Sequence, residues 1–318
     1  MKVIVSALFA SLVAEQCLAQ GWPLAPIKYI VPFPPGGATD VISRHLGEKL
    51  RDRLGQPVVI ENVGGAGSAI GVARVAKAVP DGYTIGLGNT ASHTIIPWLS
   101  ATAPYDPAAD FSPITIINEY VNVLVVHPKV PARNVRELVA LAKSKAGDMT
   151  YASSGNGASN HLSAELLARV AGVRLTHIPY KGGAPALVDV RAGQVVFMFD
   201  TIGTSMPMIR AGTLRALATT GRTRDPFLPD VPAVAESYPG YEVAGFMAVF
   251  GPAGMPKNII NRLNTELAAI IRSPEMKERL AQLCFNPRSS TPDDLAQRVR
   301  KDGAHWKALI TSAGIKLD

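Results

Sequence analysis

Residues 27–50 read IKYIVPFPPGGATDVISRHLGEKL, and residues 148–170 read DMTYASSGNGASNHLSAELLARV. Both segments follow one plan, in which a short apolar strand enters a glycine-rich turn of small residues and an amphipathic helix follows. A helix that begins at such a turn points unpaired N–H groups and the positive end of its dipole beyond the strand. Because helix N-termini bind anions, this pair predicts an anionic small molecule held between two lobes.

Strands and helices alternate through the first half of the chain. Ile42, Leu46 and Leu50 recur four residues apart after the first turn, which makes one apolar helix stripe. Such alternation predicts an α/β fold with a parallel sheet covered on both faces. We expect strands at residues 27–31, 58–61 and 84–87, and helices after Thr39 and Ser68.

The same alternation restarts in the second half of the chain and predicts a second α/β lobe. Two extended stretches, residues 116–126 and 242–250, are expected to join the lobes as a two-strand hinge, and hinged lobes close around ligands. We expect the helices after Pro256 to pack back onto the first lobe. The expected division is lobe 1 at residues 20–120 and 245–318, and lobe 2 at residues 121–244.

The N-terminus predicts a secretory signal peptide of residues 1–19. Lys2 forms a short basic region, an apolar stretch follows, and Cys17 and Ala19 supply small residues for cleavage after Ala19. A membrane anchor or a buried helix is the alternative interpretation of this segment. We therefore expect an exported, periplasmic protein.

Composition argues against several classes of partner. The 318 residues carry a net charge of +7, but lysine and arginine are scattered and the 6% of aromatic residues do not interleave with them. A nucleic-acid surface needs such interleaving, so we expect no nucleic-acid partner. Cleavage leaves Cys284 as the one cysteine, which gives no basis for a disulfide or a cysteine metal site. We expect neither metal nor cofactor.

The two turns supply the candidate binding groups. Gly37, Ala38 and Thr39 are expected to form one shallow cup of amide donors, with Asp40 at the start of the helix. The run from Ser153 to Asn160 offers amides and hydroxyls without a fixed positive charge, which suits a carboxylate that must be released again. The alternative is that both turns are ordinary strand-to-helix connections.

Further side chains are candidates for selecting the ligand. Asn89 follows the third strand, where open α/β sheets place ligands. His161 lies just after the second turn, and Asp200 ends an apolar strand. Each has a structural alternative as a polar loop, packing or capping residue. The candidate ligand-binding residues are Phe33, Gly37, Ala38, Thr39, Asp40, Asn89, Ser154, Gly157, Ala158, Ser159, Asn160, His161 and Asp200.

Catalytic motifs are weak. The stretch GGAGSAIG at residues 64–71 misses the dinucleotide pattern because Ile70 stands where the last glycine belongs. Ser153 or Ser154 with His161 could form a nucleophile and base, but no orienting acid follows at a recognisable spacing. We expect a receptor without catalytic residues, and keep as the alternative a secreted hydrolase acting on a carboxylate ester or amide.

Six runs in order carry a family resemblance. They are PFPPGGATD (32–40), ENVGGAGSAIG (61–71), PDGYT (80–84), SSGNGASNHL (153–162), YKGGAPAL (180–187) and LPDVPAVAE (228–236). Over nearly the whole mature chain the sequence resembles the Bug family of extracytoplasmic solute receptors, the substrate-binding component of tripartite tricarboxylate transporters.

This resemblance implies a type II periplasmic-binding-protein fold that captures carboxylates through backbone amides and waters at the two turns. It also implies a membrane permease of two subunits as partner, and we expect a monomeric receptor. Some members of the family serve as sensors without a dedicated transporter, and the sequence is compatible with that role as well. Ala158 stands where the family often has serine, and Phe246 where many members have tryptophan. The first difference removes a possible hydroxyl donor, which bears on ligand specificity rather than fold.

Overall fold

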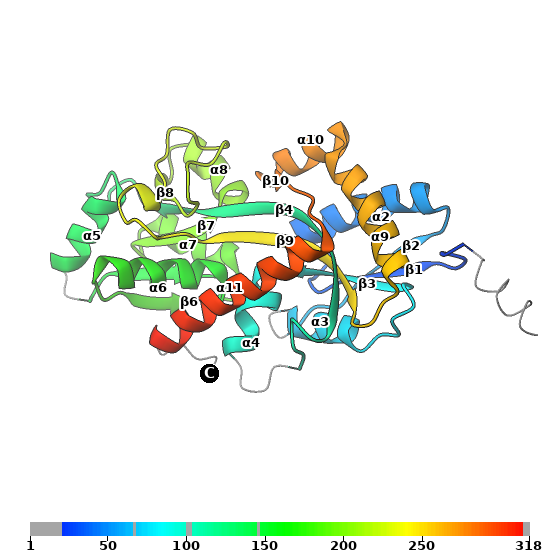
Figure 1. Cartoon of the computed structure of the whole chain (residues 1–318). Helices are drawn as coiled ribbons and strands as arrows, with labels where there is room; N and C mark the ends of the chain where they lie inside the picture. The colour runs from blue at the N-terminus through cyan, green and yellow to red at the C-terminus, as the bar shows by residue number, and fades with distance from the viewer. Residues whose placement is uncertain (1–20, 66–67, 100–103, 145–146, 314–318) are drawn as a thin grey trace, which may run out of the picture.

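The computed structural model describes residues 21–65, 68–99, 104–144 and 147–313. These residues form two α/β lobes, which lie side by side and are joined by long strands (Figure 1). The predicted signal peptide, residues 1–19, lies outside the described part of the chain. Within the described ranges, no helix combines the length and the apolar character needed to cross a membrane.

Lobe 1 is built on three parallel strands, with β1 (Ile27–Val31) between β2 and β3. The stripe of Ile42, Leu46 and Leu50 on α2 is buried against this sheet, as the spacing predicts. The other elements of lobe 1 are α2 (Ala38–Leu54), β2 (Val58–Asn62), α3 (Ala69–Ala76), β3 (Thr84–Asn89), α9 (Lys257–Arg272) and α10 (Pro274–Gln282).

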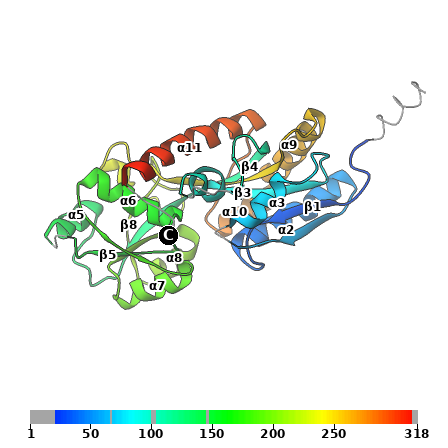
Figure 2. The same cartoon turned by 90° about the horizontal axis from the view of Figure 1, so that it is seen from below.

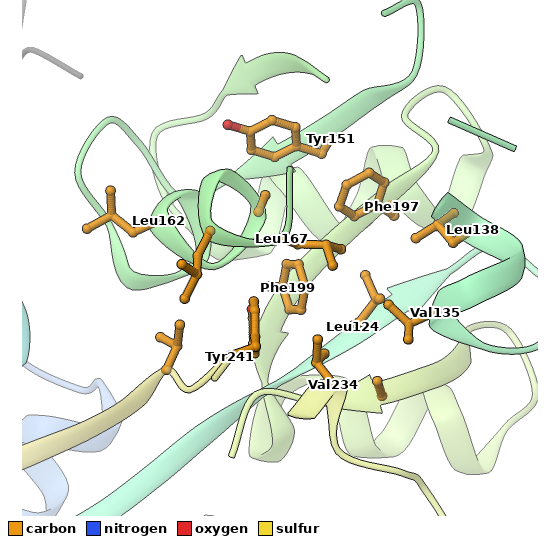
Figure 3. Packing of buried hydrophobic residues seen from close by; sticks show 14 of the residues in the cluster. Leu124, Val135, Leu138, Tyr151, Leu162, Leu167, Phe197, Phe199, Val234 and Tyr241 are labelled. Atoms are coloured by element: carbon orange, nitrogen blue, oxygen red, sulfur yellow. The ribbon is translucent and has the colours of Figure 1, made fainter. Parts of the chain in front are cut away.

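Lobe 2 repeats this construction around an aromatic core. Phe197 and Phe199 of β7 pack among Tyr151, Leu162 and Tyr241 (Figure 3). The elements of lobe 2 are α5 (Val135–Ser144), β5 (Thr150–Ser153), α6 (Ser159–Ala171), β6 (Thr176–Pro179), α7 (Gly183–Ala192), β7 (Phe197–Thr201), α8 (Ile202–Arg210), β8 (Arg215–Thr219) and the 3₁₀ turn η3 (Val234–Glu236).

Two strands cross between the lobes, as the sequence predicts. The first part of β4 (Phe111–Val126) pairs with β9 (Ala244–Pro252), and its last five residues pair with β7 and β8. Because β4 leaves lobe 1 and β9 returns to it, the two strands run antiparallel, so the sheet is mixed rather than parallel throughout. The division at residues 120/121 and 244/245 remains a prediction within this crossing.

The C-terminal helix departs from the expectation that it packs on lobe 1 alone. Leu295 and Val299 of α11 (Pro292–Ala313) pack beside Phe250, whereas Trp306 and Ile310 join the core of lobe 2. A helix of this length reaches about 33 Å, which is enough to bridge the halves (Figure 2). The remaining short elements are the π-helical turn η2 (Ala91–Ile95), α4 (Ile96–Leu99) and β10 (Asn286–Pro287).

Candidate functional site

A cavity of about 730 Å³ lies between the lobes, at the ends of β1, β3 and β5. Tyr120 of the crossing strand β4 contributes to its wall. None of the described residues that line it carries a charged side chain. They are Pro32, Phe33, Pro34, Gly65, Ser68, Asn89, Ala91, Ile96, Tyr120, Ser154, Gly155, Asn156, Gly157, Ala158, Ser159 and Gly182.

A second hollow, of about 970 Å³, is larger but lies on one side of lobe 1. Its lining includes Lys28, Arg74 and Lys77, and two of these cations already pair with Glu61. It receives no residue from lobe 2 among the described parts of the chain. The interlobe cavity is therefore the candidate site, because its lining includes residues from both glycine-rich regions.

The lobe 2 turn uses many of its own donors internally. The amide of Ser154 donates to Asn160 Oδ1 at 3.2 Å, and that of Gly157 donates to His161 Nδ1 at 3.0 Å. Ala158 N–H likewise donates to the carbonyl of Gly155. The predicted amide cup is thus narrower than the sequence indicates.

The first turn of α6 keeps free donors. The amides of Ser159 and Asn160 have no acceptor within the described residues, and Ser159 itself lines the cavity. These N–H groups lie at the positive end of the helix dipole. The lobe 2 side of the cavity can therefore accept a carboxylate without a cationic side chain.

Asn160 and His161 are buried behind the loop and do not line the cavity. Besides the Ser154 amide, Asn160 Oδ1 accepts the Ser154 hydroxyl at 3.2 Å and the His161 amide at 3.0 Å. Both side chains therefore bind the loop from behind. The structure places them where they shape the donor surface rather than contribute to it.

On lobe 1, Phe33 lines the cavity, whereas Gly37, Ala38 and Thr39 lie outside its lining. The Gly36 amide donates to Asp40 Oδ2 at 2.9 Å, which closes the turn. Arg44 donates to the same oxygen at 3.0 Å and is the main reason why the pKa of Asp40 falls to about 2. Asn62 binds the other carboxylate oxygen at 2.9 Å. Asp40 thus organises the turn.

Asn89 lines the cavity, but its amide oxygen accepts the Ser92 N–H at 2.9 Å and so supports the start of η2. Asp200 is buried outside the cavity lining, and its Oδ2 accepts the Ser205 hydroxyl at 2.8 Å. Burial raises the pKa of Asp200 to about 6, against the opposing hydrogen bonds. Asp200 therefore stabilises the first turn of α8 through Ser205 and does not line the cavity.

Ser68 is a cavity residue that the sequence reasoning missed. It lies at the N-terminal end of α3 with φ +92°, and its buried hydroxyl has no hydrogen-bond partner within the described residues. Ser68 belongs to the GGAGSAIG stretch, which follows a strand and opens a helix as the other two turns do. This shared strand–turn–helix pattern could have identified Ser68 from the sequence. No sequence pattern identifies Tyr120, because its place at the cavity depends on how β4 crosses between the lobes.

Metal binding finds no support in the described ranges, where no three histidine, cysteine, aspartate or glutamate side chains gather as a cation site. Ser153, the other candidate nucleophile, shares its hydroxyl with His177 Nε2 at 2.6 Å rather than with His161. No acid is hydrogen-bonded to His177 within the described structure. The serine and histidine residues thus form a loop support.

Comparison with known proteins gives a consistent result. The family model described as "Tripartite tricarboxylate transporter family receptor" matches residues 42–315. Protein BugT of Bordetella pertussis is 34% identical over 307 residues, which cover 96% of this chain and 94% of BugT.

Solved structures extend the similarity to three dimensions. A protein of R. palustris solved with adipate has a TM-score of 0.83 and 35% identity, covering 93% of this chain and 99% of its own. MatC from Rhodopseudomonas palustris, with bound malate, has a TM-score of 0.79 and 31% identity, covering 91% of this chain and 100% of MatC. The similarity therefore spans both lobes.

Proposed function

Since this chain belongs to the tripartite tricarboxylate transporter family of receptors, the Bug family, we propose that its interlobe cavity binds a dicarboxylate with an aliphatic spacer. The chain is a solute-binding receptor for a small organic carboxylate and not an enzyme, so the hydrolase alternative is set aside. The observation that carries the proposal is the pairing of neutral donors with apolar walls in one cavity.

The donors lie on both lobes. The Ser159 amide offers a carboxylate site at the start of α6, and Ser68, whose buried hydroxyl has no partner within the described residues, lines the cavity on lobe 1. Hydrogen bonds to an ionised carboxylate are shorter and stronger than neutral ones. A ligand that engages both sets of donors would hold the lobes together, as hinged receptors require.

The walls favour an apolar spacer. Phe33 and Ile96 line the cavity together with Pro32, Ala91 and Tyr120, and apolar walls with few polar groups are typical of small-molecule sites. A hydroxyl on the ligand spacer that faces Phe33 or Ile96 would lose its water without gaining a hydrogen bond. We therefore propose tighter binding of adipate than of malate, the two ligands with which relatives were solved.

Isothermal titration calorimetry tests this proposal with adipate, malate, hexanoate and adipamide as probes. We expect adipate to bind at least about tenfold more tightly than each of the other three, because only adipate combines two charged ends with a spacer that carries no polar group. Equal affinity for adipamide would contradict carboxylate recognition. Tighter binding of malate would contradict the role of the apolar walls.

The cellular setting is part of the same proposal. The relatives are receptors of tripartite transporters, and we propose that this chain is exported, cleaved after Ala19, and delivers its ligand as a monomer to a permease of two membrane subunits. Mass spectrometry of protein from a periplasmic extract tests the cleavage. Light scattering with and without adipate tests the monomer.

A further inference from the structure

Two imidazole rings lie against each other directly behind the cavity loop of lobe 2. His161 of α6 and His177 of β6 stack with ring centroids 4.0 Å apart and planes within 5°. The ring of Tyr151, on β5, continues the stack at 4.9 Å from His177. Neither imidazole belongs to the cavity lining, so neither is explained by direct ligand contact.

Each imidazole is connected to the backbone of the loop. His161 Nδ1 accepts the Gly157 amide at 3.0 Å. His177 Nε2 lies 2.6 Å from the Ser153 hydroxyl, whose oxygen in turn accepts the Gly155 amide at 3.1 Å. Since Gly155 and Gly157 line the cavity, the two rings determine how this backbone faces the ligand.

The hydrogen bond from Gly157 defines the protonation state of His161. A backbone N–H can only donate, so Nδ1 of His161 must carry a lone pair. The proton of the neutral ring then lies on Nε2, 4.0 Å from Glu165 Oε1. A second proton on Nδ1 would remove the acceptor that Gly157 uses.

We propose that His161 is a positioning residue of the binding site, which holds the cavity loop through Gly157 and releases it when Nδ1 becomes protonated. The proposal rests on the proposed function of the cavity and adds to it a control by pH. His161 does not touch the ligand in this account. It fixes the loop conformation that presents the free amide of Ser159.

The surroundings of His161 favour the neutral ring. Burial, and after it the neighbouring charge of His177, lowers the pKa of His161 to about 4. Burial also lowers the pKa of His177 to about 4. The other titratable groups facing the pair are Glu165 of α6 and Tyr151 of β5, whose hydroxyl donates to Glu165 Oε1 at 2.5 Å. Release is therefore expected only in acid, with its midpoint at about pH 4.

Three variants test the proposal. His161→Leu removes the acceptor, whereas His161→Asn places an amide oxygen close to the position of Nδ1 and does not titrate. His127→Leu is the matched control, because His127 Nδ1 accepts the Lys129 amide at 2.9 Å on a loop remote from the cavity. Far-UV circular dichroism shows whether each variant folds.

The first measurement needs no ligand: hydrogen exchange and the NMR shift of the Gly157 amide. We expect His161→Leu to lose protection of this amide at least about tenfold, while His161→Asn and His127→Leu keep it. Unchanged protection in folded His161→Leu would overturn the proposal. This readout stays valid even if no tested dicarboxylate binds, so failure of the proposed function is distinguishable.

The second measurement is the pH profile of adipate affinity between pH 4 and 8, in the wild-type protein and His161→Asn. Adipate is protonated to the same extent in both experiments, so the ratio of the two affinities reports on His161. We expect the ratio of His161→Asn affinity to wild-type affinity to rise about twofold from pH 7 to pH 4, because half of the His161 rings are protonated at a pH equal to their pKa of about 4. Parallel profiles would overturn control by protonation of His161.

Discussion

Arg298 of α11 donates to Glu119 Oε1 on the crossing strand β4 at 2.7 Å. The same guanidinium donates to the Ala244 carbonyl at the start of β9 and lies 5.7 Å from the centroid of the Phe246 ring. One side chain thus joins the helix that bridges the lobes to both crossing strands. This contact lies at the place about which the lobes would turn.

Replacing Arg298 by methionine is expected to lower the free energy of unfolding by about 2 kcal/mol, because it leaves partly buried acceptors without their charged donor. Arg288→Met is the control, since Arg288 donates to the other Glu119 oxygen but is 60% exposed. Exposed pairs contribute about 0.5 kcal/mol. Urea denaturation measures both, and equal losses would show that Arg298 is no more than a surface ion pair.

Ser68→Ala should weaken adipate binding by about tenfold without lowering stability. The hydroxyl is buried and unpartnered within the described residues, so its removal costs the ligand a hydrogen bond and costs the free protein none. Calorimetry and thermal unfolding measure the two effects.

Thr219→Val provides the comparison for Ser68. Its hydroxyl is also buried and without a partner in the described structure, but Thr219 lies on β8 outside the cavity lining. We expect adipate affinity to remain unchanged in this variant. A Ser68→Ala protein that binds as well as Thr219→Val would exclude Ser68 from the site.

The fold was predictable because its signals are local. The two segments at residues 27–50 and 148–170 show their strands, turns and helices through apolar spacing and glycine, and the structure places these elements there. The bridging course of α11 was not predictable in this way. Its amphipathic pattern shows that one face is buried, but the pattern does not say which lobe covers each turn.

The site was predictable only as far as turns can be recognised. Small residues identify the loop at Ser154–Ser159, which lines the cavity. Which amides remain free is decided by the loop conformation: Gly157 donates to His161, so its N–H is occupied although its sequence position suggests a ligand donor. Ser68 is harder to recognise, because residues 64–71 resemble an incomplete nucleotide-binding motif more than they resemble the other two turns.

Asp200 and Asp40 should respond to pH with opposite signs. The pKa of Asp200 is raised to about 6 in the folded protein, so the folded state keeps a proton that the unfolded state has lost. The stability of the wild-type protein therefore falls from this group as pH rises from about 4 to 6. Asp200→Asn should gain about 2 kcal/mol relative to wild type across that window.

Asp40→Asn supplies the opposite case. The pKa of Asp40 is lowered to about 2, mainly by the hydrogen bond from Arg44, so its contribution is present above pH 4 and is lost as pH falls toward 2. The deficit of Asp40→Asn should shrink over that range. Urea midpoints at several pH values measure both variants, and slopes of the same sign would contradict these assignments.

Gly157→Val should separate loop geometry from general stability. Gly157 has φ +75°, a left-handed conformation that a β-branched residue adopts at a cost of about 1–2 kcal/mol. Gly212 has φ +67° at the end of α8, with open space around it, and Gly212→Val carries the same backbone cost away from the cavity.

We expect similar losses of thermal stability and intact far-UV circular dichroism in both variants. Only Gly157→Val should lose adipate affinity, by at least about tenfold, because only its backbone connects His161 to the cavity. Equal affinities in the two variants would mean that the conformation of this loop does not control binding.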